Sequence, residues 1–215
     1  MSDGQVRQLT GWAGVLIAAL TVVTVPLYFV YSGPPPADNV HTRNLLTLLT
    51  CAAFVVFFTG LNHLMRRAEP AVEWPASLFF AAGLLYMAMT LFAVAHEAGV
   101  AFGAPDGSLD PTTDGPLAEA NILIHGSIKR LLTAMLLLAG GFAAVRSRLI
   151  PRWLGLAAYA IAGINLLFLP SMFFGTDVTK FYSAHGWGNS ALAGSLILYW
   201  TLAVGIVLLR RPRVG

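Results

Sequence analysis

The sequence has few charged residues and a single cysteine. Of its 215 residues, 11% are Asp, Glu, Lys or Arg, 57% are hydrophobic, and the mean hydropathy is +0.71. Soluble domains usually carry about 25% charged residues, so this composition is not that of an ordinary soluble domain. Cys51 is alone, which excludes an intramolecular disulfide and a Cys-based metal motif. Glycine-rich nucleotide loops and serine or cysteine nucleophile motifs are also absent, which argues against the common soluble chemistries.

The chain contains six long apolar blocks instead. Each has roughly 18 to 25 residues, the length that a helix needs to cross a hydrocarbon core about 30 Å thick. The blocks do not alternate in short segments, which excludes a closed barrel. We therefore predict an all-α integral membrane bundle of about six transmembrane helices, forming one domain over residues 1–215. The predicted helices cover residues 12–31, 45–65, 76–95, 118–145, 153–174 and 190–209.

Arginine residues gather on one side of this six-helix scheme. That side holds Arg7, Arg66, Arg67, Arg146, Arg148, Arg152, Arg210, Arg211 and Arg213, whereas Arg43, Lys129, Arg130 and Lys180 remain for the other. Cytoplasmic loops of membrane proteins carry an excess of Lys and Arg. We therefore expect a multi-pass protein of the cell membrane with both termini in the cytoplasm. These basic clusters flank helix ends, so we expect no nucleic-acid partner.

The outer side has a long connection at residues 98–117. Its turn-forming elements, Pro105-Asp106-Gly107, Asp110-Pro111 and Asp114-Gly115-Pro116, predict a surface loop without a helix of its own. Proline-rich residues 32–44 and residues 175–189 form the other two outer loops.

A resemblance to known proteins lies in the turn between the fourth and fifth helices. The run Arg146-Ser147-Arg148-Leu149-Ile150-Pro151-Arg152-Trp153-Leu154-Gly155 resembles a signature of small polytopic bacterial membrane proteins of unknown function, frequent in actinobacteria. That resemblance implies architecture and no chemistry. The same residues are also those of a cytoplasmic turn, with arginines at a helix C-terminus and Pro151 starting the next helix.

The fourth helix carries polar residues that should lie inside the outer leaflet. Its strictly apolar part, residues 131–145, is too short to span, so Lys129 and Arg130 fall within the membrane. At spacings of four residues, Asn121, His125, Lys129 and Thr133 form one stripe, which should face protein or water.

The third helix ends at the same level with His96 and Glu97. Glu97 is the natural counter-charge for Lys129 or Arg130, and a structural ion pair would account for these residues. The alternative is an outward-opening pocket covered by the acidic loop and by the segment from His185 to Gly188, with aromatic walls such as Tyr86 and Trp187.

Two functions fit such a polar cluster. We favour a protein that binds a small amphiphile, a membrane lipid or a membrane partner protein through the cluster. The alternative is a membrane-embedded enzyme, such as an acid-initiated cyclase of prenyl chains, because small membrane terpene cyclases are similar in size and helix number. In that case Glu97 would donate the proton, His96 would tune it, and aromatic rings would stabilise carbocations.

Metal or haem ligation by these histidines is a further alternative. His96, Glu97, His125 and His185 could converge on a metal, and His96 and His125 could hold a haem. The sequence has no dense ligand motif such as His-Glu-x-x-His and no haem-attachment motif. We therefore expect no metal and no cofactor.

Overall fold

The computed structural model describes residues 1–115 and 117–210, and over these residues it is a helical bundle. Six spans are long and apolar enough to cross a membrane, which confirms the predicted all-α bundle and fits a multi-pass membrane protein. Three are α1 (Asp3–Leu27), α2 (Ala37–Ala68) and α3 (Glu73–Gly103), the last preceded by a 3-10 turn, η1 (Pro70–Val72). The other three spans each join two or more elements. The fourth consists of α4 (Ala118–Leu123), η2 (Ile124–Ile128) and α5 (Lys129–Arg146). The fifth consists of α6 (Arg152–Leu167) and η3 (Leu169–Phe174), and the sixth of η4 (Gly188–Ala193) and α7 (Gly194–Arg210).

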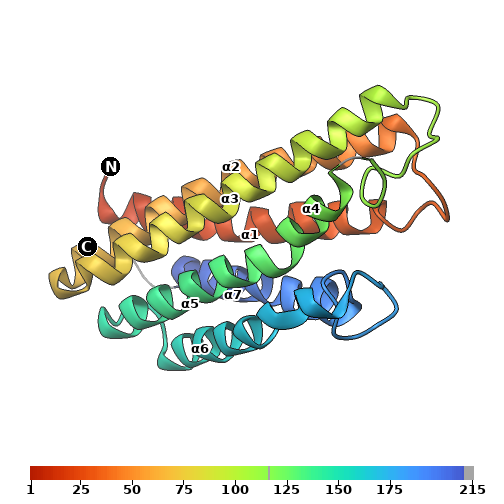
Figure 1. Ribbon diagram of the computed structural model, residues 1–215. Helices are drawn as coiled ribbons and strands as arrows, with labels where there is room; N and C mark the ends of the chain where they lie inside the picture. The colour runs from red at the N-terminus through yellow and green to blue at the C-terminus, as the bar shows by residue number, and fades with distance from the viewer. Residues whose placement is uncertain (116, 211–215) are drawn as a thin grey trace.

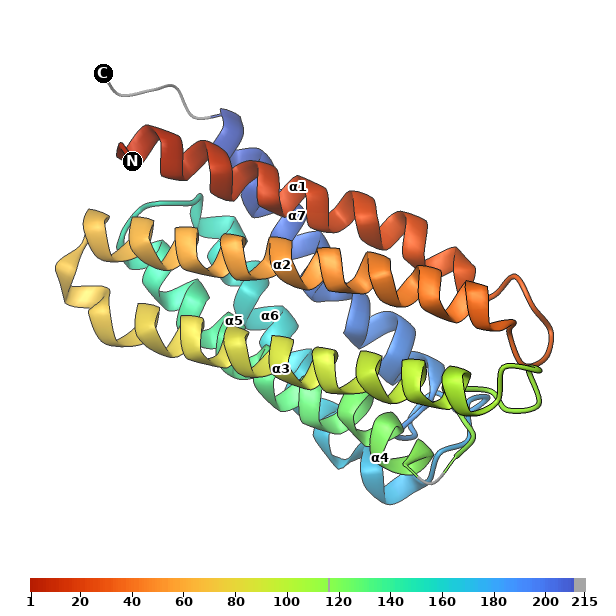
Figure 2. The ribbon, with the colours of Figure 1, turned by 90° about the horizontal axis from the view of Figure 1, so that it is seen from above.

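The spans form a ring in which nearly every helix packs against its neighbours in the chain. The order around the ring is α1, α2, α3, α5, α6 and α7, and extensive packing of α7 against α1 closes it. Figures 1 and 2 show α1, α2 and α3 as long, nearly parallel rods, with α5, α6 and α7 on one side of them. The described chain begins and ends at the same end of the bundle, as an even number of spans requires.

The first three helices are longer than the apolar blocks predicted, although the first ends at Leu27 and not at residue 31, whereas the other three spans agree with the prediction to within two residues. The first begins at Asp3 instead of residue 12, because Ser2 and Gln5 form a capping box in which each side chain accepts a hydrogen bond from the other's backbone N–H. The third continues to Gly103, so residues 98–103 are helical and the prediction of a loop there is wrong. Hydropathy marks the part that lies in lipid, whereas backbone hydrogen bonds and helix contacts carry the helix further. Pro116, in the predicted turn at residues 114–116, lies outside the described residues, as do Arg211 and Arg213.

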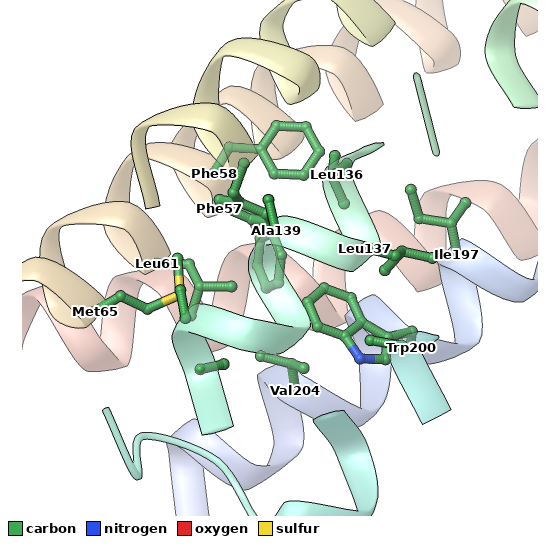
Figure 3. Close-up of a cluster of buried hydrophobic side chains, with 14 of the residues drawn as sticks. Phe57, Phe58, Leu61, Met65, Leu136, Leu137, Ala139, Ile197, Trp200 and Val204 are labelled. Atoms are coloured by element: carbon green, nitrogen blue, oxygen red, sulfur yellow. The ribbon is translucent and has the colours of Figure 1, made fainter. Parts of the chain in front are cut away.

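The core is a layer of large apolar side chains in the middle of the bundle. Phe57, Phe58 and Leu61 of α2 meet Leu136 and Leu137 of α5 and Ile197, Trp200 and Val204 of α7 (Figure 3). Trp200 also donates its indole N–H to the backbone carbonyl of Leu154, 3.0 Å away on α6. This bond connects α7 to α6, against which it packs less extensively than against α1. The indole N–H of Trp200 is therefore hydrogen-bonded although the ring is buried.

Glycines let α1 and α7 approach at backbone contact. A Cβ on Gly205 would lie 2.8 Å from the carbonyl oxygen of Gly11, and one on Gly14 would lie 3.0 Å from that of Thr201. Membrane helices gain packing contacts in this way, because lipid supplies no hydrophobic drive for association. The contact fixes α1 beside α7 and so closes the ring.

One end of the bundle is rich in exposed charged groups. Asp3 pairs with Arg67 at 3.6 Å and with His63 at 3.5 Å, and Arg66 pairs with Glu73. The N-terminus of α1 therefore lies beside the connection between α2 and α3. This end also carries Arg146 and Arg152, so the predicted gathering of arginines at one end is present among the described residues.

Candidate functional site

A buried ion pair lies near the opposite end of the bundle. The guanidinium of Arg43 on α2 is 3.3 Å from the carboxylate of Glu97 on α3, and the two side chains are 2% and 3% exposed. The ring of Tyr28, just after α1, lies 4.2 Å from the same guanidinium. Three neighbouring segments are thus connected through one arginine. The sequence suggested that Lys129 or Arg130 of the fourth span would pair with Glu97, but Arg43 neutralises its charge instead.

The ring of His125 lies between Glu97 and Lys129. Its Nε2 is 3.8 Å from Oε1 of Glu97, and its Nδ1 is 3.5 Å from Nζ of Lys129. An ammonium group can only donate, so Nδ1 accepts and the proton of a neutral ring sits on Nε2, facing the carboxylate. His125 therefore separates the two charges that the sequence suggested would pair.

Lys129 has no carboxylate within ion-pair distance among the described residues. Its side chain is 5% exposed, and besides His125 its nearest partner is the ring of Tyr86, whose centroid is 5.2 Å from Nζ. An ammonium over an aromatic face gains some electrostatic stabilisation. That is less than a carboxylate would give, so Lys129 is a buried cation with incomplete compensation.

Lys129 faces a cavity of about 190 Å³. Apolar and aromatic groups form much of its wall, and five threonines, Cys51, His125 and Lys129 supply the polar atoms. The lining residues are Thr21, Thr24, Val25, Thr47, Thr50, Cys51, Phe54, Tyr86, Met87, Thr90, His125, Lys129 and Leu198. They come from α1, α2, α3, the fourth span and α7, so the cavity lies within the ring of helices.

The neighbouring Arg130 is bound on a different side of α5. It donates from NH1 to Oδ1 of Asn165, 3.2 Å away on α6, and from NH2 to the carbonyl of His125 at 3.1 Å. Both acceptors are neutral, and Arg130 does not line the cavity. Consecutive residues point about 100° apart on a helix, so Lys129 and Arg130 serve different interfaces.

The fourth span changes its helical geometry at the site. Residues 124–128 are π-helical, and Gly126 has a non-helical ψ of −112°. A Cβ there would lie 2.5 Å from the carbonyl oxygen of Ala184, so only glycine permits this approach. A π turn inserts an extra residue and rotates the preceding helix face relative to the next one. Asn121 is therefore buried but outside the cavity lining, although its spacing from His125 and Lys129 suggested one stripe.

A second π-helical segment, η4, packs against the first. Asn189 donates through its amide to Oγ of Ser171 at 3.0 Å and to the carbonyl of Ala184 at 2.9 Å. Ser171 in turn lies 3.5 Å, oxygen to oxygen, from Ser127 in η2. These buried contacts hold the loop at residues 175–187 over the end of the fourth span.

Three other residues of the predicted site lie outside the cavity lining. His96 is half-buried, and neither ring nitrogen has a hydrogen-bond partner in the described part of the chain. Trp187 is 54% exposed and contacts Phe181 edge-on, with centroids 4.6 Å apart. His185 is half-buried in the 175–187 loop, where burial lowers its pKa and Asp110 acts in the opposite sense. Of the predicted residues, only Tyr86, His125 and Lys129 line the cavity.

The sequence did not point to Arg43 or the threonines. Arg43 precedes the apolar block of α2 and was assigned to a loop, but it lies in the second turn of a longer helix. Thr47, Thr50 and Cys51 follow it at one-turn spacings, a polar stripe that could have indicated a helix face directed at a cavity. Among the described residues, no three His, Cys, Asp or Glu side chains gather as metal ligands.

No protein-family profile matches this sequence, and no curated protein and no solved structure matches it. The resemblance of residues 146–155 to bacterial membrane proteins of unknown function therefore stays a prediction.

Proposed function

We propose that the protein binds a small amphiphile inside the membrane, in the cavity between α1, α2, α3, the fourth span and α7. The observation that carries the proposal is the cavity itself, which joins apolar walls such as Phe54, Met87 and Leu198 to a polar edge formed by Lys129 and His125. Ligand sites are typically apolar hollows with a few convergent polar groups. An amphiphile would place its apolar part against the apolar walls and its polar group against Lys129 and His125.

The buried ion pair between Arg43 and Glu97 supports a binding role. Arg43 and Glu97 lie on the two helices that supply most of the lining and hold them together near its outer end. A buried pair of this kind keeps helices in a fixed arrangement, because separating the charges is costly. The site is thus built from rigid helices, which favours selective binding of a ligand of defined size.

Binding is favoured over acid-initiated catalysis by the position of Glu97. A general acid needs a proton to give and a substrate within reach. The carboxylate of Glu97 is paired with Arg43 and does not line the cavity, so it does not face a substrate bound there. A small-molecule ligand is also favoured over a partner protein, because the polar groups line a small hollow between helices and do not form a broad outer surface.

The orientation of the protein is inferred from its charges. We place the end with Arg66, Arg67, Arg146 and Arg152 in the cytoplasm of a cell membrane, because basic residues are enriched there. The chain's ends are then cytoplasmic, and the cavity belongs to the outer half of the membrane. A small amphiphile would reach it from that leaflet or from the outer aqueous side.

Native mass spectrometry of the purified protein tests whether the cavity is occupied. The informative variant is Thr50→Phe, which places a ring in the cavity, and the matched control is Thr59→Phe, on the exposed face of α2 outside this cavity. We expect a bound small molecule in the wild type and in Thr59→Phe, and its loss in Thr50→Phe.

Two results would contradict the proposal. An adduct of unchanged abundance in a folded Thr50→Phe protein would place the ligand elsewhere. An empty wild type that takes up no added single-ring or short-chain amphiphile would leave the cavity without a binding role.

A further inference from the structure

We infer that the ligand is a carboxylate, a small organic monoanion whose charge pairs with Lys129. This inference rests on the proposed function and adds the chemical class of the ligand. Its basis is the charge balance of the site, the hydrogen bonds of its lining and the size of the cavity.

The buried groups around the cavity carry an excess of positive charge. Three cations, Arg43, Lys129 and Arg130, are each at most 5% exposed, and the one buried carboxylate among the described residues is Glu97. Arg43 already forms an ion pair with that carboxylate. A buried cation without an anion is unfavourable, so the cluster lacks a negative charge.

Lys129 is the cation that remains available. Arg130 is bound to Asn165 and to the His125 carbonyl, outside the cavity. Lys129 borders the cavity, and its nearest acceptors are an imidazole nitrogen at 3.5 Å and the face of an aromatic ring. An ammonium has three donors, so at least one can serve a ligand. Asp110, from the outer loop, accepts hydrogen bonds from the backbone N–H and hydroxyl of Thr112, and among the described residues it forms no ion pair with Lys129.

The threonines decide against a more highly charged ligand. All five in the lining donate their hydroxyl protons to the backbone carbonyl four residues earlier, at 2.8 or 2.9 Å; they are Thr21, Thr24, Thr47, Thr50 and Thr90. Their oxygens therefore present lone pairs to the cavity and offer few donors to an anion. One ammonium is the main anion-binding donor, which matches one negative charge. A phosphate dianion would lack a second cation.

The volume of the cavity limits the size of the ligand's apolar part. A dry cavity of about 150 Å³ lined by aliphatic and aromatic side chains holds benzene. The 190 Å³ found here is therefore enough for one ring or a short alkyl chain with its carboxylate. Benzoate has this size, and benzyl alcohol and benzylammonium are its neutral and cationic counterparts.

The cysteine of the chain provides the assay. Cys51 lines the cavity and is the sole thiol in the sequence, so ligands in the cavity should slow its alkylation by a small maleimide. The protein in lipid nanodiscs is titrated with benzoate, benzyl alcohol and benzylammonium. We expect benzoate to protect Cys51 at concentrations at least about tenfold lower than benzyl alcohol, and benzylammonium to protect least.

The variant Lys129→Met isolates the ammonium. It should remove the advantage of benzoate over benzyl alcohol, so that the two compounds protect Cys51 at similar concentrations. The matched control is Lys180→Met, because Lys180 is the other lysine of the chain and is exposed beside Asp177. It should keep the benzoate preference. Hexanoate, compared with its alcohol, extends the series to a short alkyl chain and should show the same preference for the acid.

The results separate the two proposals. Equal protection by benzoate and benzyl alcohol, or a benzoate preference that survives in Lys129→Met, overturns the carboxylate inference and leaves the binding cavity standing. Alkylation of Cys51 that no compound slows overturns the proposed function itself.

Discussion

The guanidinium of Arg43 lies 3.3 Å from the carboxylate of Glu97, and both side chains are almost fully buried between α2 and α3. Removing one partner from such a pair leaves an uncompensated charge in a medium of low polarity. That cost is about 3–5 kcal/mol, much larger than the net contribution of the pair itself.

The variant Glu97→Gln should therefore lower the free energy of unfolding by about 3 kcal/mol or more. Replacing both partners in Arg43→Met with Glu97→Met should recover most of this loss, because no charge is then left alone. The control is Glu73→Gln, whose pair with Arg66 is exposed and should contribute less than about 1 kcal/mol. Reversible unfolding in mixed micelles measures all four proteins. A Glu97→Gln loss as small as the Glu73→Gln loss would contradict this account.

The position of this pair illustrates the reach of hydropathy as a predictor. The six spans are confirmed because an apolar block of about 20 residues has few alternatives to crossing a membrane. Arg43 was missed because it lies just before such a block, where hydropathy cannot distinguish a loop from a continuing helix. The helix is extended there by contacts with α1 and α3, which the sequence of α2 alone does not contain.

The partners within the site were harder to predict for a related reason. Lys129 and Glu97 are at similar depths, which suggested an ion pair, but His125 lies between them. The regular spacing from Asn121 to Thr133 assumed one continuous α-helix, and the π turn at residues 124–128 interrupts it. That turn depends on the close approach of Ala184 to Gly126, a contact between segments almost 60 positions apart in the chain. Local patterns do not report such contacts.

A second prediction concerns the contact between α1 and α7. In Gly205→Ala the added methyl would lie 2.8 Å from the carbonyl oxygen of Gly11, so the two backbones must separate. We expect a loss of about 1–3 kcal/mol in the free energy of unfolding, typical of an overpacked interface. Gly163→Ala in α6 is the control, because its Cβ would meet no atom within 4 Å. Alanine favours helix over glycine, so this variant should be neutral or more stable by up to about 1 kcal/mol. Equal losses in the two variants would exclude the close approach.

A third prediction concerns Asn189, which holds the 175–187 loop. The variant Asn189→Ala removes its amide bonds to Ser171 and to the Ala184 carbonyl in a fully buried position. We expect backbone amides of residues 175–187 to exchange hydrogen at least about tenfold faster, because each lost buried bond costs about 1–3 kcal/mol.

Mass spectrometry after hydrogen exchange measures that effect segment by segment. The control is Asn39→Ala at the same end of the bundle, where one amide bond, to Leu27, is lost. It should leave exchange at residues 175–187 unchanged. Slow exchange of this loop in Asn189→Ala would show that other contacts hold it.

A fourth prediction is a pH dependence of stability caused by His185. Burial lowers the pKa of this ring below its ordinary value, with Asp110 opposing the effect, so the folded state favours the neutral form. The unfolded chain then binds more protons between the two pKa values, and stability increases with pH across that window. This contribution to stability is fully present above about pH 6.5, the ordinary histidine value, and is lost as the pH falls toward the lower, folded-state pKa.

The thermal midpoint of the wild type should therefore fall between pH 7.5 and pH 5 by more than that of His185→Gln. The other four histidines are common to both proteins, so the difference between the two curves isolates this ring. Parallel curves would mean that His185 can be protonated in the folded protein without cost.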